Sequence, residues 1–193
     1  GPDRGECKLL IGSAYALLGL GILAYVVHGR SGSRLAGWAA TWVTTAAWGL
    51  LAGGLVERGL AAGHWPLTNR YEFTLGLAWT IVTIYLLLEW SWHERRAGVC
   101  VLPVALLAAT YAITRPAGEQ TIMPLLPALR SAWLPVHVLS ALVGYGAFGV
   151  AAGFGVARWW PAEGEPGRLP PAAQIEQAME RAVALGFPWL TLS

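Results

Sequence analysis

His137 is the residue whose type and position point most directly to chemistry. It follows the run 125–136 and lies one turn inside a long apolar segment. An imidazole is costly to place in a bilayer, so at membrane depth it usually faces a bundle interior or a cofactor. We expect its ring to face protein or a ligand near one membrane surface. A structural hydrogen bond to a neighbouring carbonyl is the alternative.

The residues that share the helical face of His137 are mostly small. A stripe of small residues marks the side on which transmembrane helices approach each other closely, rather than the lipid side. The stripe therefore predicts that another part of the protein covers this face of the helix. Its residues are Ser140, Ala141, Gly144, Phe148 and Ala151.

A single imidazole of this kind can serve as an axial ligand of haem iron. A four-helix b-type cytochrome does not fit, because no expected span carries two histidines, and zinc would need further nitrogen or sulfur donors on the same face. A proton relay would need intramembrane acids, and only Glu89 qualifies; with His93 four residues on, it is most simply an interface anchor. His28 suits the headgroup zone, and His64 suits a surface or capping role.

The composition is that of a membrane protein. Of 193 residues, 55% are hydrophobic and only 12% are charged, against about 25% charged in ordinary soluble domains. The mean hydropathy is +0.50. The net charge of +2 is too small to indicate a nucleic-acid partner. Arginine far outnumbers lysine, a bias typical of GC-rich bacterial genomes, so we expect a bacterial plasma membrane.

Apolar runs near the ~20 residues needed to cross a bilayer recur along the chain. We therefore predict an all-α fold, a polytopic bundle of transmembrane helices that forms a single domain over residues 1–193. An amphipathic surface helix is expected at 172–185, and an apolar segment that begins at Gly186 looks like the start of a sixth span. The five full spans are expected at about 9–27, 36–56, 73–92, 98–113 and 133–157.

Basic residues set the expected orientation. The links 28–34, 93–97 and 158–185 fall on one side, and the first two are short and densely basic, so we expect them in the cytoplasm together with the amphipathic helix. The other side, with His64, His137 and the loop 114–131, would face outward. Its arginines either pair with carboxylates of a bound anion or are solvated loop charges: Arg58, Arg70, Arg115 and Arg130.

Several motifs resemble the CcsA/ResC family, the haem-handling membrane subunit of system II cytochrome c biogenesis. Pro66-Leu-Thr-Asn-Arg-Tyr-Glu-Phe73 is similar to the outer-loop signature of that family, Pro-Leu-Ser-Asn-x-Tyr-Glu. Leu126-Pro-Ala-Leu-Arg-Ser-Ala-Trp-Leu-Pro-Val-His-Val138 resembles its Pro-Ala-Leu-x-Ser-x-Trp-Leu-x-x-His-Val run, and Tyr145 also fits. Arg181 and the following Ala-Leu-Gly-Phe-Pro-Trp-Leu-Thr run are similar to the stretch before the next helix of the family.

The resemblance implies a function in which haem b, as a transient substrate, is presented on the outer face with a CcsB/ResB-like partner. There its vinyl groups would join the cysteines of Cys-x-x-Cys-His in apocytochrome c. On that pattern His137 would ligate the haem iron as the first of two external histidines. Arg70, which departs from the usual apolar residue of the outer-loop motif, and Arg130 would contact the haem propionates. Asn69, Tyr71 and Glu72 are expected to tie the loop to helix ends.

The Trp-rich "WWD" segment of the family and its second external histidine would lie beyond Ser193. The chain lacks an initial Met and stops inside an apolar segment, so we expect a trimmed sequence that is not catalytic alone. The alternative is a naturally shortened relative that serves as a non-catalytic structural subunit of a larger membrane complex.

Overall fold

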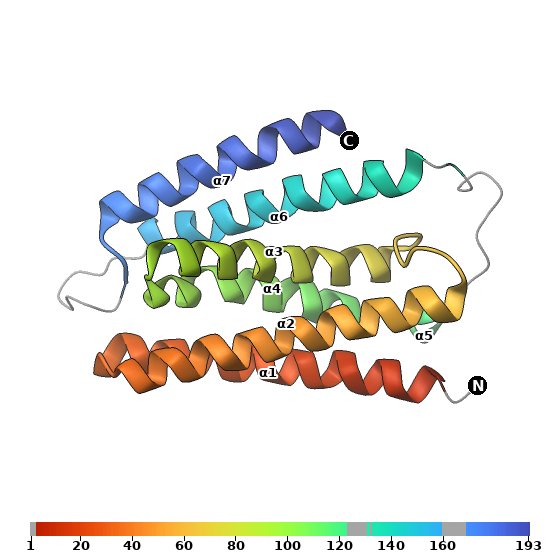
Figure 1. The fold of residues 1–193 in the computed structure, drawn as a ribbon, viewed down its shortest axis with the longest axis horizontal. Helices are drawn as coiled ribbons and strands as arrows, with labels where there is room; N and C mark the ends of the chain where they lie inside the picture. The colour runs from red at the N-terminus through yellow and green to blue at the C-terminus, as the bar shows by residue number, and fades with distance from the viewer. Residues whose placement is uncertain (1–2, 123–130, 132, 160–168) are drawn as a thin grey trace.

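The computed structural model describes residues 3–122, 131, 133–159 and 169–193. Helices make up most of these residues, and short links join them (Figure 1). In chain order the elements are α1 (Asp3–Ser31), α2 (Arg34–Ala62), α3 (Arg70–Trp92), the 3-10 turn η1 (Arg95–Ala97), α4 (Gly98–Ile113), α5 (Ala117–Gln120), α6 (Trp133–Trp159) and α7 (Ala172–Leu192).

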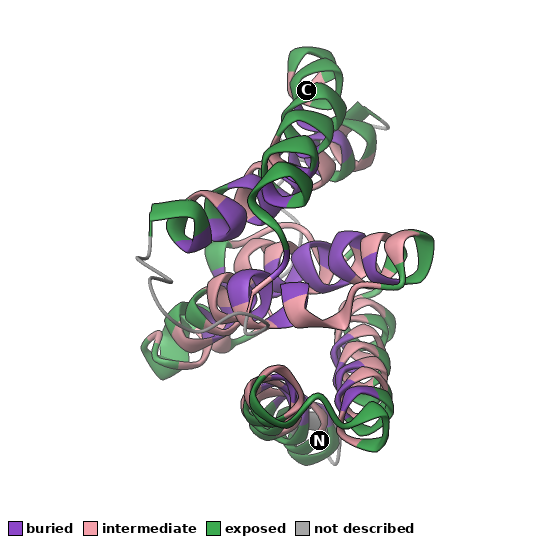
Figure 2. Ribbon diagram, turned by 90° about the vertical axis from the view of Figure 1, so that its left-hand side faces the viewer, coloured by how far each residue is buried: buried purple, intermediate pink, exposed green. Residues whose placement is uncertain are grey.

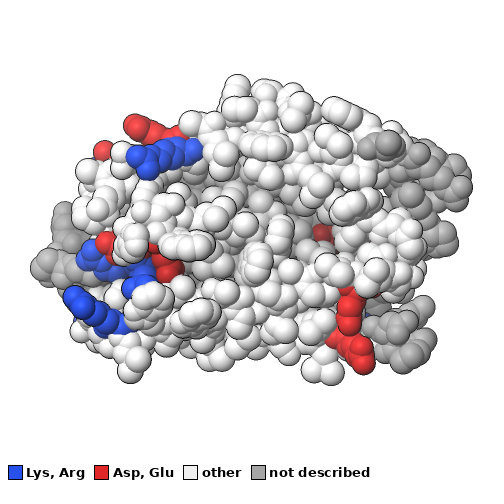
Figure 3. Space-filling view, viewed as in Figure 1, with Lys and Arg blue, Asp and Glu red and all other residues white. Residues whose placement is uncertain are grey.

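Five of these helices are long and apolar enough to cross a membrane, and they coincide with the five predicted spans. Figure 1 shows the long helices lying side by side along the long axis of the molecule, with successive helices running in opposite directions, so that the chain begins and ends toward the same side of the bundle. In Figure 3 the charged side chains of the visible face lie toward the two ends and leave an uncharged band between them. The chain is therefore a multi-pass membrane protein, and the predicted all-α fold class is confirmed.

Helices α1 and α2 extend beyond the apolar runs that predicted them, to 29 residues each. Helix α2 begins after Ser33, whose side chain accepts a hydrogen bond from the Ala36 N–H, and ends at Gly63 in the left-handed conformation. The second span was expected to end at Val56, where polar residues begin. The helix continues because Arg58 is buried against α3 rather than solvated in a loop.

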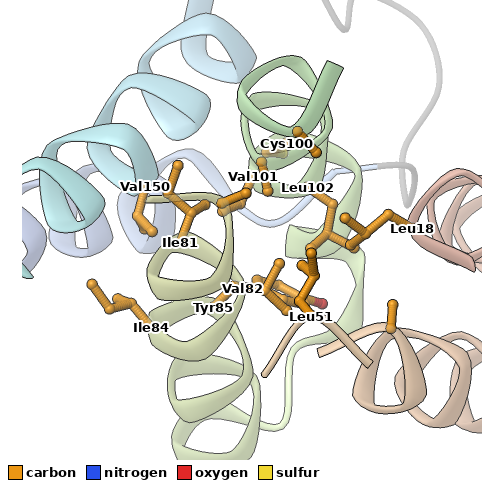
Figure 4. Close-up of a cluster of buried hydrophobic side chains, with 14 of the residues drawn as sticks. Leu18, Leu51, Ile81, Val82, Ile84, Tyr85, Cys100, Val101, Leu102 and Val150 are labelled. Atoms are coloured by element: carbon orange, nitrogen blue, oxygen red, sulfur yellow. The ribbon is translucent and has the colours of Figure 1, made fainter. Parts of the chain in front are cut away.

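The core lies where α1, α2, α3, α4 and α6 meet, and α3 and α4 lie between the α1–α2 pair and the α6–α7 pair (Figures 1 and 2). Large buried side chains from all five helices contribute, including Leu18, Leu51, Ile81, Leu102 and Val150 (Figure 4). In a bilayer, lipid competes equally well for such apolar groups, so close packing has to supply the association energy.

Glycines of α6 provide that close packing. A Cβ on Gly153 would lie 2.6 Å from the Cys100 carbonyl oxygen and 3.0 Å from the Val101 Cα, so the backbones of α6 and α4 are in contact there. One turn earlier, a Cβ on Gly149 would lie 2.9 Å from the Ile81 side chain of α3. Small residues therefore let α6 pack against two neighbours at once.

Helix α7 is continuous, whereas the sequence divided it into an amphipathic helix at 172–185 and a new apolar segment from Gly186. It runs antiparallel to α6 and packs against it through Ile175, Ala178, Ala182 and Gly186. Val183, on the same helix, is 47% exposed. Gly186 lies where the two segments join. A Cβ there would lie 3.0 Å from the Gly144 carbonyl oxygen, so the absence of a side chain lets α7 continue along α6.

The α6–α4 contact gives a stability prediction. Gly153→Ala should lower the free energy of unfolding by about 1–3 kcal/mol, because neither backbone can move away from the new methyl group. Gly155→Ala is the matched control, since a Cβ there meets only the flexible end of Met179 at 3.6 Å. Thermal unfolding in detergent, followed by tryptophan fluorescence, measures both. Equal melting temperatures for the two variants would contradict the packing described.

Candidate functional site

His137 lies in the first turns of α6, at the same end of the bundle as the α2–α3 link (Figure 1). Its side chain is exposed. Its Nδ1 is hydrogen-bonded to the carbonyl oxygen of Ser193, at the end of α7. Because this oxygen only accepts, Nδ1 is the donor of the bond, and Nε2 is left for other contacts. The ring therefore makes the hydrogen bond to a backbone oxygen that was expected as the structural alternative, and its side chain is exposed.

The small-residue stripe next to His137 marks a close helix approach, as predicted. A Cβ on Gly144 would lie 3.1 Å from the Leu190 backbone nitrogen of α7, and Ser140 is buried with its hydroxyl bonded to the Val136 carbonyl. Helix α7 therefore covers this stripe, and a flat ligand of His137 has to lie on another side of the ring.

Arg70 is the first residue of α3 and is exposed. It borders a hollow of about 320 Å³ between the start of α3 and the end of α4, which Leu67, Asn69, Phe73, Thr74 and Tyr111 also line. Arg130, the third predicted haem-contacting residue, lies outside the described residues. Arg70 and His137 therefore share one end of the molecule.

A buried ion pair fixes the start of α3. The Arg58 Nη2 lies 2.8 Å from the Glu72 Oε1, and the two side chains are only 6% and 1% exposed. The other Glu72 oxygen accepts from the backbone N–H and the hydroxyl of Thr68, at 3.0 and 3.1 Å. The Glu72 N–H in turn donates to the Asn69 side chain at 2.9 Å.

This arrangement confirms that Asn69 and Glu72 tie the loop to helix ends. It also corrects both roles expected for Arg58, a partner of a bound anion or a solvated loop charge, because Arg58 is buried and paired with Glu72. The partner that buries Arg58 lies 14 positions further along the chain, so no local pattern identifies the pair.

A second buried carboxylate lies at the opposite end of the bundle. Glu89 accepts hydrogen bonds from the Tyr25 and Tyr85 hydroxyls, both at 2.5 Å, and from the Thr41 hydroxyl. The Arg95 Nε lies 3.5 Å from its other oxygen. Glu89 therefore joins α1, α2, α3 and η1.

This network overturns the predicted pairing of Glu89 with His93. Residue His93 instead ends α3 in the left-handed conformation, with φ 56°, and its backbone N–H donates to the Glu89 carbonyl. Beside it, burial alone would raise the pKa of the Glu94 carboxyl, but hydrogen bonds from the Arg96 side chain and backbone outweigh this and lower its pKa. Glu94 thus stays charged and caps η1.

The remaining histidines have local partners. His28 Nδ1 is hydrogen-bonded to the Ser33 carbonyl in the α1–α2 link, and His64 Nδ1 to the Trp65 carbonyl in the α2–α3 link, both at 2.9 Å. Within the described ranges, no three His, Cys, Asp or Glu side chains gather as a metal site. The Nδ1 atoms of His28, His64 and His137 thus all bond a backbone oxygen, and His137 differs from the other two in being exposed.

Comparison with known proteins identifies the family. Residues 67–193, which include the start of α3, His137 and all of α7, match the model of the family described as cytochrome C assembly protein. Curated relatives named cytochrome c biogenesis protein CcsA are 43% identical over 94 residues in a Picosynechococcus species, 42% over 93 residues in Trieres chinensis and 34% over 112 residues in Gloeothece citriformis. The chain belongs to the CcsA family of cytochrome c assembly proteins.

The matched segments cover 48%, 48% and 58% of this chain and 28%, 30% and 34% of the three relatives, respectively. This CcsA-family chain therefore spans about a third of the length of the curated relatives it matches. No solved structure matches it significantly. The Arg58–Glu72 pair joins a residue before the family match to one inside it, so the match alone does not reveal the pair.

The ion pair gives a second stability prediction. Glu72→Gln keeps the size of the side chain but leaves the Arg58 charge buried without an acid, so the free energy of unfolding should fall by about 3–5 kcal/mol. The control is Glu176→Gln, whose pair with Arg158 is exposed and should contribute less than about 1 kcal/mol. Melting temperatures in detergent measure both variants, and a Glu72→Gln protein as stable as the control would refute the buried pair.

Proposed function

We propose that this CcsA-family chain holds haem at the extracytoplasmic face on His137 and presents it for thioether attachment to apocytochrome c. The observation that carries the proposal is the geometry of His137. Its ring is exposed, its Nδ1 is engaged by a backbone carbonyl, and its Nε2 is available. A metal-ligating histidine usually donates its other ring N–H in this way, which fixes the tautomer and the ring orientation.

The surroundings of His137 suit a flat, apolar macrocycle. Its neighbours on α6 include the exposed side chains of Trp133, Val136 and Leu139. Two turns further along α6, the Tyr145 ring packs edge-on against Phe73 of α3, with centroids 6.2 Å apart. A macrocycle held on Nε2 would rest on this apolar surface at the end of the bundle and keep one edge in water.

Haem is the substrate in this proposal, and its attachment needs little from the protein beyond position. A cysteine thiol of Cys-x-x-Cys-His adds across a vinyl group: the sulfur bonds to the carbon next to the porphyrin ring, and the hydrogen goes to the terminal carbon. Electrons balance without an added oxidant or reductant. Holding thiol and vinyl together then supplies most of the rate enhancement. Ligation by one histidine leaves the second axial position for the histidine of the apocytochrome.

The partners follow from the same family. We propose a CcsB/ResB-like membrane protein as the companion of this chain and apocytochrome c as the acceptor, in the bacterial plasma membrane. The end of the bundle with His137 would face the extracytoplasmic side, and the 172–185 part of α7 would begin at the cytoplasmic side. A structural subunit without haem is the alternative that the following experiment separates.

Substitution of His137 tests the haem site. We expect His137→Ala to lower the haem retained by the purified chain at least about tenfold, and millimolar imidazole to restore the Soret band, because the added ligand replaces the lost nitrogen. Soret absorbance and pyridine haemochromogen content measure this. His64→Ala is the control at the same end of the bundle. Unchanged haem in His137→Ala would refute the ligand, and a wild-type chain that takes up no haem would favour the structural role.

Cysteine labelling tests the orientation. In a chain whose buried Cys7 and Cys100 are replaced, a cysteine at exposed Thr121 should react with a membrane-impermeant maleimide in intact cells. One at exposed Ser31, in the α1–α2 link, should react only after the membrane is opened. The expectation rests on the basic links at the Ser31 end. The reverse labelling pattern would invert the proposed topology.

A further inference from the structure

The arginines at the His137 end of the bundle are not equivalent. Arg58 is buried and donates to the Gln120 carbonyl, and its charge is already neutralised by Glu72. Arg70 and Arg115 have no acidic partner among the residues that the structure describes. These two are therefore the arginines able to take up an anionic ligand.

Arg115 is held in place without being neutralised. Its guanidinium lies 4.2 Å from the centroid of the Tyr111 ring, a cation–π contact. Its backbone is fixed on both sides: the N–H donates to the Ala112 carbonyl at 3.1 Å, and the carbonyl accepts from the Gln120 side chain at 2.6 Å. Only the side chain of this residue is open to further bonding.

The Nε of Arg115 is buried and lacks a hydrogen-bond partner in the described part of the chain. An unpaired buried donor is unfavourable, and an unpaired charged one more so. Such a donor is expected to have an acceptor in the working state of the protein, and a carboxylate matches the forked geometry of a guanidinium.

Tyr111 connects Arg115 to the hollow at the start of α3. The ring that carries the guanidinium also lines this hollow of about 320 Å³, together with Arg70 and the apolar Leu67 and Phe73. Apolar side chains and Arg70 thus line the hollow, and Arg115 stacks on the Tyr111 ring that also lines it. This combination fits an apolar ligand that carries acidic groups on one edge.

An aromatic surface leads from the hollow to helix α6. Phe73, which lines the hollow, contacts Tyr145, which is 48% exposed. Tyr145 follows His137 on α6 by eight positions, a rise of about 12 Å. The two arginines and the imidazole therefore lie at the same end of the molecule and are connected by exposed aromatic rings.

We infer that Arg70 and Arg115 clamp the two carboxylate arms of haem. The inference rests on the proposed function, because it assumes the haem that His137 holds. Both carboxylate arms of haem lie on one edge of the ring, and the vinyl groups lie elsewhere. A clamp on the acidic edge fixes the rotation of the macrocycle about the iron–nitrogen bond. The vinyl groups are then turned away from the hollow, where a thiol can reach them.

The test compares haem with its dimethyl ester, in which both carboxylates are masked. The purified chain in neutral detergent is titrated with each compound, and the Soret shift gives the affinity. The wild-type chain should bind haem on the order of tenfold more tightly than the ester. The Arg70→Gln/Arg115→Gln double variant should bind the two compounds equally, with its affinity for the ester unchanged.

Two further variants control for charge and folding. Arg34→Gln removes an exposed arginine at the opposite end of the bundle and should keep the wild-type preference. The Arg115→Lys single variant, with Arg70 intact, keeps the charge but loses the forked geometry of the guanidinium. It should therefore keep part of the wild-type preference for haem over the ester. Melting temperatures within the wild-type range would show that the variants are folded.

The outcomes separate the two proposals. If the wild-type chain binds both compounds equally, or the double variant keeps the preference for haem, the clamp is overturned while haem binding by His137 stands. If neither compound shifts the Soret band of the wild-type chain, the proposed function fails and the clamp fails with it. A double variant that loses affinity for the ester as well would assign the arginines a structural role and also overturn the clamp.

Discussion

The buried Arg58–Glu72 pair is the interaction on which the His137 end of this protein depends. It joins α2 to the first turn of α3, and through the Gln120 carbonyl it also holds α5. Removing one partner of such a pair leaves an uncompensated charge in a low-dielectric interior. The positions of Arg70, the hollow beside it and the chain after α4 all follow from this anchor, so the anchor supports the site without belonging to it.

The membrane explains why polar groups are grouped as they are. Unsatisfied polar groups are costly in hydrocarbon, and both buried carboxylates lie near an end of α3, with every acceptor in use. Glu72 serves one end and Glu89, with its tyrosine and threonine donors, the other. Between these two ends, α6 packs closely against its neighbours at Gly149 and Gly153. This close packing stabilises the bundle, because burying apolar side chains away from lipid gives little driving force for helix association. Hydrogen bonds and ion pairs to buried carboxylates thus hold the two ends of the bundle, and close packing at glycines holds its middle.

His137 differs from these anchors because it is exposed, although a backbone carbonyl holds it. Helix α7 supplies that carbonyl and covers the small-residue face of α6, so the accessible side of the imidazole is directed away from α7. In the proposed function, this arrangement separates the group that holds the ring from the nitrogen that would bind iron. Arg70 and Arg115 complement it, because their charges are not neutralised within the described chain and lie beside an apolar hollow. A rigid scaffold with a few uncommitted polar groups is what the transfer of a bound substrate to a second protein requires.

The sequence alone determined the all-α membrane fold, the five spans and the resemblance to a cytochrome c biogenesis family, because apolar run length and local motifs are properties of neighbouring residues. It also placed His137 near the end of a span and assigned Asn69 and Glu72 to the loop anchor. Only the tertiary structure decided that Arg58 is buried, that Glu89 binds Tyr25 and Thr41 rather than His93, and that α7 continues along α6. Those partners are separated by 14 to 64 positions. They meet only when the helices pack, since pairing a buried charge is a property of the assembled bundle.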